Sequence, residues 1–117
     1  MGPISQLASI DMAEEYQIAF CTAPDMEVAE RLAASMVEQK LAACVNLLPQ
    51  VTSVYQWQGQ IEKEQEILML IKTEADLMLE LGEFLDNQHP YEVPELISCN
   101  IEQASASYLQ WLSDTLK

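Results

Sequence analysis

Positively charged residues are scarce in this sequence. Its 117 residues include five Lys and Arg against 19 Asp and Glu, which gives a formal net charge of -14 at pH 7. Nucleic acids and anionic membrane surfaces are bound through clustered Lys and Arg. The composition therefore predicts no nucleic acid and no membrane partner. It is compatible with cation binding, and equally with acidic side chains that only keep the surface solvated.

Long apolar runs, paired cysteines and glycine-rich loops are missing as well. The longest apolar run covers residues 67–71, far short of the ~20 residues that span a bilayer. No basic segment followed by an apolar one marks a secretory signal. The three cysteines include no Cys-x-x-Cys pair, which is typical of a reducing compartment. We therefore expect a cytoplasmic protein without disulfides.

The apolar periodicity predicts the order β-α-β-β-α-β followed by a terminal helix. Thr22 and Thr73 are the expected helix caps, and Pro49 is expected to interrupt a strand as a bulge or edge feature. The expected strands cover residues 16–21, 41–48, 51–57, 60–72 and 95–101, and the expected helices lie at 22–40, 73–86 and 105–116. This order predicts an α+β, ferredoxin-like (βαββαβ) sandwich whose sheet carries helices on one face.

Residues 1–11 differ from the rest and are interpreted as a leader, so that residues 12–117 form a single domain. The terminal helix is expected to carry Tyr108, Trp111 and Leu112 on one face. Residues 67–71 lack alternation, which predicts that both faces of that strand are covered.

A long β-hairpin is expected around a tight turn at Gln58 and Gly59. Arms of about 13–15 residues, at ~3.4 Å each, would reach about 45 Å, whereas a domain of this size has a radius of gyration of about 13–14 Å. The hairpin should therefore project and expose Tyr55 and Trp57. We infer a homo-oligomer in which a neighbouring subunit covers these two aromatic residues.

Two chemically versatile residues are expected to meet at one end of this fold. Cys21 ends the first strand and His89 precedes the last, and these strands are neighbours in the βαββαβ order. Cys21 also lies before a helix N-terminus, whose dipole favours a thiolate, and a thiolate with an imidazole suits copper or zinc. Glu92 and Glu95 add carboxylates. A lone cysteine is, however, most often a small buried apolar residue.

Other sulfur-containing residues and enzyme-like patterns give weaker signals. Cys44 and Cys99 lie inside expected strands and are interpreted as core residues, as are Met36 and Met69. A Cys–His dyad would need an orienting residue and an oxyanion hole, and the sequence offers no convincing third member. We therefore expect a protein that is not an enzyme.

Five sequence blocks resemble the CutA divalent-cation tolerance family. The matching blocks are CTAPD at residues 21–25, KLAACVN at 40–46, YQWQG at 55–59, HPYEVPE at 89–95 and YLQWL at 108–112. They lie in the family's order and spacing, and the resemblance covers residues 16–117. Residues 12–117 are accordingly interpreted as one CutA-type domain.

The resemblance implies a homotrimer of ferredoxin-like subunits, similar to the PII signalling proteins. It also implies a role in tolerance of copper and other divalent cations, with no obligatory cofactor. The metal ligands proposed for the family carry over to Cys21 and His89, with Glu92 and Glu95 nearby. Some relatives have a second His where this chain has Gln88.

The PII likeness leaves a second function open. A cleft between subunits would bind a small molecule and act in regulation, and the residues to examine there are Lys72, Glu66, Tyr91, Trp57 and Glu92. An acidic cleft suits a cation better than a phosphate. A third alternative, a purely structural interaction module, would bind neither a metal nor a small molecule.

Overall fold

The computed structural model describes residues 15–117, so the leader predicted at residues 1–11 lies outside the described residues. The described chain forms, in order, β1 (Tyr16–Ala23), α2 (Met26–Glu38), β2 (Cys44–Trp57), β3 (Gln60–Glu74), the short 3-10 helix η1 (Ala75–Leu77), α3 (Met78–Gln88), β4 (Ile97–Asn100) and α4 (Ala106–Leu116).

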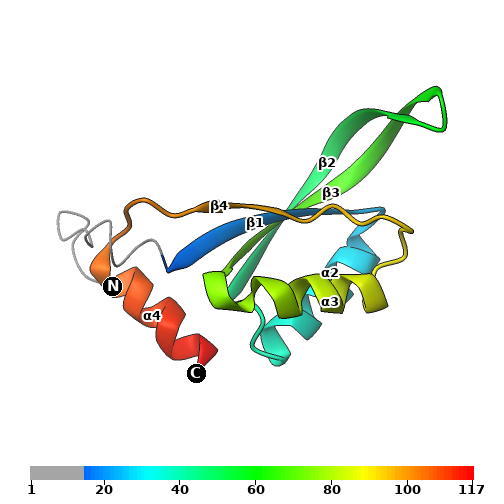
Figure 1. Cartoon of the computed structure of the whole chain (residues 1–117). Helices are drawn as coiled ribbons and strands as arrows, with labels where there is room; N and C mark the ends of the chain where they lie inside the picture. Colours follow the sequence, from blue (N-terminus) through cyan, green and yellow to red (C-terminus); the bar gives the residue numbers. More distant parts are fainter. Residues whose placement is uncertain (1–14) are drawn as a thin grey trace.

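The four strands form one antiparallel sheet in the order β2-β3-β1-β4. Helices α2 and α3 lie side by side on one face of this sheet, and α4 packs at the end where β1 begins (Figure 1). The predicted ferredoxin-like α+β sandwich is confirmed. Within the described residues, no helix has the length and apolar character needed to cross a membrane.

The core lies between the sheet and its two helices. Alternate residues of β1 and β3 point to this side because side chains in a strand alternate between faces. Ala19 and Cys21 pair with Ile71 and Met69, and all four are completely buried. The helices contribute the buried residues Ala29, Leu32, Met36, Leu81, Phe84 and Leu85. The core positions predicted for Met36 and Met69 are confirmed.

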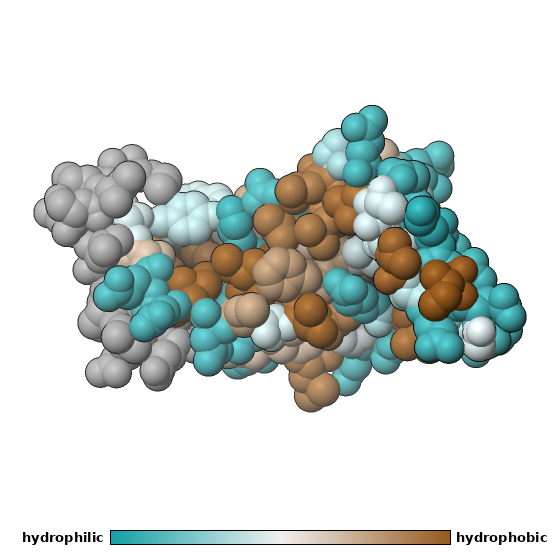
Figure 2. Space-filling view, turned by 90° about the horizontal axis from the view of Figure 1, so that it is seen from above, coloured by the Kyte–Doolittle hydropathy of each residue, from teal (hydrophilic) through white to brown (hydrophobic). Residues whose placement is uncertain are grey.

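The opposite face of the sheet is apolar and only partly covered by the chain itself. Ile18, Phe20, Leu68 and Leu70 are half-buried there, and Ile97 is exposed. Figure 2 looks onto this face and shows hydrophobic side chains gathered over its centre. We call these five residues the open sheet face. Both faces of residues 67–71 were expected to be covered. Within one chain, the helices cover one face, and the other face is only partly covered.

Cys44 and Cys99 both lie on the side of the sheet that faces away from the helices, so the prediction that both are core residues is wrong. Cys44 pairs with Lys72, and Cys99 pairs with Ile18. Cys99 is exposed and Cys44 is half-buried. The strand assignment was right, but the register turns both side chains away from the helices.

The hairpin of β2 and β3 projects from the body, as predicted (Figure 1). The described chain measures 48 × 25 × 22 Å. Gln58 and Gly59 form the turn with positive φ angles of 50° and 80°, the combination that matches strand twist in a two-residue hairpin turn. A bulge lies between Leu48 and Val51, at the position of Pro49. The predicted turn and bulge are both confirmed.

The helix starts differ from the predicted capping residues. Asp25, not Thr22, caps α2, since its Oδ1 accepts a 2.8 Å hydrogen bond from the Val28 N–H. Thr22 remains in β1, paired with Leu68. Thr73 likewise stays in β3 and donates a 2.7 Å hydrogen bond to the Leu41 carbonyl. In both places strand pairing extends further than the local capping signals indicate.

The terminal helix α4 packs against the start of β1 mainly through two leucines. Leu109 and Leu112 are fully buried against Tyr16 and Ala43, and Tyr108 packs beside them. Trp111, although it lies close to the Tyr108 ring, is 44% exposed.

Candidate functional site

Cys21 and His89 lie together at the end of β1. His89 is buried, and its Nε2 lies 2.8 Å from the carbonyl oxygen of Thr22. The Cys21 thiol points at the same oxygen, 3.6 Å away. The two residues are brought together because β1 ends where the chain leaves α3.

Both ring nitrogens of His89 are used in hydrogen bonds to the backbone. Nδ1 accepts a 3.0 Å hydrogen bond from the Tyr91 N–H. Nε2 must then carry the proton that it donates to the Thr22 carbonyl, so these partners define a neutral tautomer. The ring also lies 4.7 Å from that of Tyr91, centroid to centroid. His89 therefore holds the loop after α3 against β1.

Cys21 is a buried thiol. Its burial, followed by the charges of Glu95 and Glu66, raises its pKa to about 12. The expectation that the start of α2 favours a thiolate is therefore wrong, because desolvation outweighs the helix dipole. Helix α2 also begins only at Met26, after its own cap at Asp25.

A resident copper ion does not fit Cys21 and His89 as the structure arranges them. Copper binds a thiolate and an unprotonated imidazole nitrogen, whereas here the thiol is protonated and both nitrogens are already engaged. Residues 15–117 hold no group of three or more His, Cys, Asp and Glu side chains that could bind a metal ion.

A cleft of about 860 Å³ lies above this pair, between the hairpin and the loop that follows α3. Five of the eight residues named from the sequence line it: Trp57, Glu66, Tyr91, Glu92 and Glu95. Glu62 and Glu64 also line the cleft, although they were not among the predicted site residues. The signal was present, because positions 62, 64 and 66 alternate along a strand and so share one face.

One face of the hairpin forms a wall of this cleft. Tyr55 pairs with Glu62, and Trp57 pairs with Gln60. Directly paired residues project to the same face of a sheet, so the rings of β2 lie beside the carboxylates of β3. Tyr55 is 39% exposed and Trp57 is 43% exposed. The predicted exposure of both rings is confirmed.

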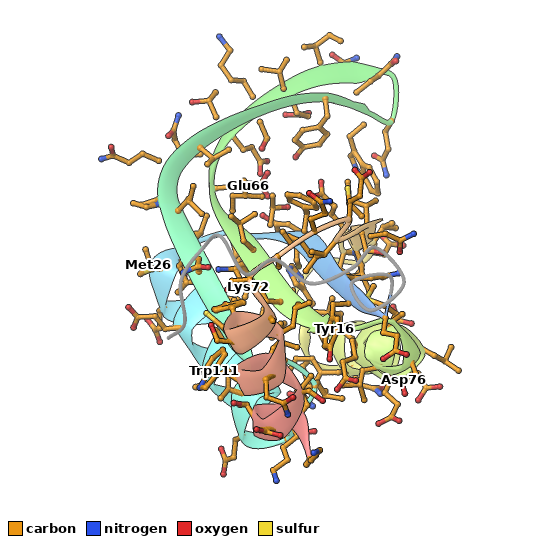
Figure 3. The ribbon with its side chains drawn as sticks, turned by 90° about the vertical axis from the view of Figure 1, so that its left-hand side faces the viewer. Tyr16, Met26, Glu66, Lys72, Asp76 and Trp111 are labelled. Carbon is orange, nitrogen blue, oxygen red and sulfur yellow. The ribbon has the colours of Figure 1, made fainter. Side chains whose placement is uncertain are left out.

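Glu66 lies at the base of the cleft, where the hairpin curves away from the body (Figure 3). It is only 6% exposed. The Tyr91 hydroxyl donates a 2.6 Å hydrogen bond to its Oε2. Burial and then the charge of Glu66 raise the pKa of Glu95. Burial, the hydrogen bond to Glu66 and nearby carboxylate charges raise that of Tyr91.

The cleft is therefore strongly negative. The described residues that line it include five Glu and neither Lys nor Arg. Burial is the largest cause of both pKa increases, and the neighbouring carboxylate charges add to it. The carboxylate part of this field favours a bound cation.

Lys72 lies away from this cleft. Its Nζ is 5.7 Å from the centroid of the Tyr108 ring, a contact that joins β3 to α4. Figure 3 shows Lys72 next to α4 and Glu66 further along β3, at the hairpin. In this chain Lys72 therefore stabilises the packing of the terminal helix and does not line the cleft.

Comparison with known proteins places this chain in a defined class, that of the divalent-cation tolerance proteins. A family model described as CutA1 divalent ion tolerance protein matches residues 17–115. Protein CutA of Homo sapiens is 46% identical over 111 residues, which are 95% of this chain and 62% of the human protein. The divalent-cation tolerance protein CutA of Thermus thermophilus is 41% identical over 98 residues, covering 84% of this chain and 95% of the relative.

Solved structures agree with these sequence matches. The structure of CutA from Synechococcus elongatus has a TM-score of 0.90 and 34% identity, with 97% of each chain covered. That of CutA1 from Oryza sativa has a TM-score of 0.86 and 37% identity, covering 91% of this chain and 97% of the rice chain. The chain belongs to the CutA1 divalent ion tolerance protein family. It spans about half to two thirds of its mammalian relatives, 62% of the human and 53% of the mouse protein.

The state of Cys21 can be tested by alkylation. At about pH 8, we expect iodoacetamide to modify Cys21 in the folded protein at least about a thousandfold more slowly than in denatured protein, because the buried thiol holds its proton. Peptide mapping by mass spectrometry would measure both rates. Modification of the folded protein within tenfold of the denatured rate would show that Cys21 is an accessible thiolate.

The structural role of His89 can be tested with His89→Phe. This change keeps a ring but leaves the Thr22 carbonyl and the Tyr91 N–H without partners, so we expect the free energy of unfolding to fall by about 2–4 kcal/mol. Urea denaturation at fixed protein concentration would measure it. Gln88→Ala, at the neighbouring exposed position, should change stability by less than about 0.5 kcal/mol. Equal effects of the two variants would contradict the role of His89.

Proposed function

We propose that this chain is a non-enzymatic, homotrimeric cation-binding protein of the cytoplasm that contributes to divalent-cation tolerance. The observation that carries the proposal is the cleft, whose five glutamates face no lining Lys or Arg within the described residues. Family membership supports the tolerance role. The proposal that the protein is not an enzyme is supported by the sequence, which offers no convincing third member for a catalytic Cys–His dyad.

The cleft carboxylates, rather than Cys21 and His89, are the groups that attract the metal in this proposal. The glutamates line a large open space and do not converge on one point within the described chain. A copper or other divalent ion would accordingly be held as a hydrated cation by the summed field of the carboxylates. Such binding is weak and depends strongly on ionic strength.

The open sheet face supports the trimer. Ile18, Phe20, Leu68 and Leu70 form an apolar surface that one chain leaves in contact with water. Contiguous apolar surfaces of this kind mark interaction sites. We propose that copies of this chain cover one another's open sheet faces.

A regulatory trimer that binds a small molecule in the cleft is the second candidate function. The aromatic wall favours it, because Tyr55, Trp57 and Tyr91 give the cleft an apolar lining that a bare metal ion does not require. The volume of about 860 Å³ also falls within the range of small-molecule sites.

The trimer can be tested by light scattering. The wild-type protein should have about three times the chain mass of 13.2 kDa. Leu70→Glu should shift the mass to that of a single chain, because it places a charge in the centre of an apolar interface. Leu79→Glu is the matched control, because Leu79 is 76% exposed on α3. A monomeric wild type, or a Leu70→Glu trimer with an unchanged circular dichroism spectrum, would contradict the proposal.

Cation binding can be tested by calorimetry with Cu²⁺. We expect the affinity to fall at least about tenfold between ionic strengths of about 0.01 M and 0.5 M. The double variant Glu92→Gln/Glu95→Gln should bind several-fold more weakly at low salt.

Glu30→Gln/Glu38→Gln removes the same charge from exposed positions of α2 and should retain wild-type affinity. Salt-independent binding that is lost in His89→Phe and kept in Glu92→Gln/Glu95→Gln would overturn the carboxylate site and favour the Cys21 and His89 ligands.

A further inference from the structure

The cleft combines solvent-exposed aromatic rings with a group of carboxylates. Tyr55 and Trp57 expose 39% and 43% of their surface, and both line the cleft together with Glu62, Glu64 and Glu66. Large exposed rings beside uncompensated carboxylates form a surface that is apolar and negative at once.

We propose that this cleft binds a small organic cation, a methylated or alkylated ammonium group. Tyr55 and Trp57 would contact its alkyl groups while Glu66 and Glu95 balance its charge. This inference rests on the second candidate function, the small-molecule cleft, and assigns its ligand class.

The aromatic wall is suited to an ammonium group by its geometry. Tyr55 and Trp57 lie two residues apart on β2 and share a face, about 7 Å apart along the strand. Aromatic faces attract cations within ~6 Å of the ring centroid, and desolvation strengthens the attraction to about 2 kcal/mol. Tyr91 lies on the opposite wall, where the contact with His89 and the hydrogen bond to Glu66 hold it in place.

The carboxylates at the base supply the charge. Glu66 is buried, and its side chain accepts the Tyr91 hydrogen bond through Oε2. Its charge acts on Glu95, another lining residue. A cation placed between Glu66 and Glu95 relieves their repulsion, and partial burial makes that interaction stronger than in open water.

Other ligand classes fit the cleft less well. An anion or a nucleotide would meet five glutamates and, among the described lining residues, no Lys or Arg. A directly coordinated metal ion needs several ligand atoms at about 2.0–2.6 Å, and no such group exists in residues 15–117. An ammonium ion requires neither, because its charge is spread over a larger, partly apolar surface.

Tetramethylammonium is the probe for the test, with tert-butanol as its neutral counterpart of similar shape. The chain has two Trp, so the full-length Trp111→Phe protein leaves Trp57 as the only Trp reporter. We expect tetramethylammonium to change Trp57 fluorescence in a saturable way, and tert-butanol or an equal concentration of KCl to leave it unchanged.

Variants in the same background assign the contacts. Tyr55→Leu removes a ring and should weaken binding about five- to tenfold, whereas Tyr55→Phe keeps the ring and should bind within about twofold of the parent. Glu66→Gln can still accept the Tyr91 hydrogen bond and should weaken binding similarly. Glu95→Gln repeats the charge test if Glu66→Gln does not fold. Glu102→Gln, an exposed control outside the cleft, should have no effect.

The outcomes separate the ligand class from the function on which it rests. If tert-butanol binds as tightly as tetramethylammonium, the cleft is a small-molecule site but the cationic class is wrong. If no probe gives a saturable change, the inference fails, whereas the second candidate function does not depend on this result because it names no ligand class. If Tyr55→Leu lowers the oligomer mass in light scattering, the rings serve to cover a neighbouring subunit and the inference is overturned.

Discussion

The carbonyl oxygen of Thr22 fixes the position of the loop that follows α3, and the cleft depends on that position. His89 donates to this oxygen through Nε2 and accepts from the Tyr91 N–H through Nδ1. Tyr91 then donates its hydroxyl proton to Glu66 on β3. Three hydrogen bonds thus connect the end of β1, through the loop, to the root of the hairpin. Because each bond is at least partly buried, losing one leaves a polar group without a partner.

These hydrogen bonds give His89 a structural role instead of the metal-binding role that the sequence suggests. A lone His beside a Cys suggests a metal site, yet here the imidazole connects two segments of backbone. The negative charge lies on the other side of the loop, on carboxylates that line open space. The chain belongs to the CutA1 divalent ion tolerance protein family. For the cation binding that we propose, the arrangement of this chain favours the carboxylates of the cleft over Cys21 and His89 as the binding groups.

Much of the fold could be predicted from the sequence, because its signals are local. Apolar periodicity gives the order of the strands and helices, the two residues at positions 58 and 59 give the turn, and Pro49 marks the bulge. The approach of Cys21 to His89 follows from topology alone. Strand ends were less predictable, since pairing with β3 keeps Thr22 in a strand despite its capping potential.

The chemistry of the site was harder to predict from the sequence, because it depends on burial by residues that are distant along the chain. The pKa of Cys21 depends on the packing around it and on Glu95 and Glu66, which are far along the chain. The exposure of Cys99 depends on register, which no local pattern determines. The alternation of Glu62, Glu64 and Glu66 was readable, but its importance appears only once the loop that follows α3 lies opposite.

The bulge between Leu48 and Val51 determines which residues of β2 face the cleft. Strand side chains alternate, so an uninterrupted strand continuing from Leu48 would place Gln50, Thr52, Val54 and Gln56 on the side that Leu48 occupies. The extra residue reverses this parity, and Val51 and Tyr55 pair with Glu66 and Glu62 instead. One inserted residue thus converts a wall of aliphatic and amide groups into one of aromatic rings. A loss of that single residue elsewhere in the family would turn the two aromatic rings away from the cleft without substituting either of them.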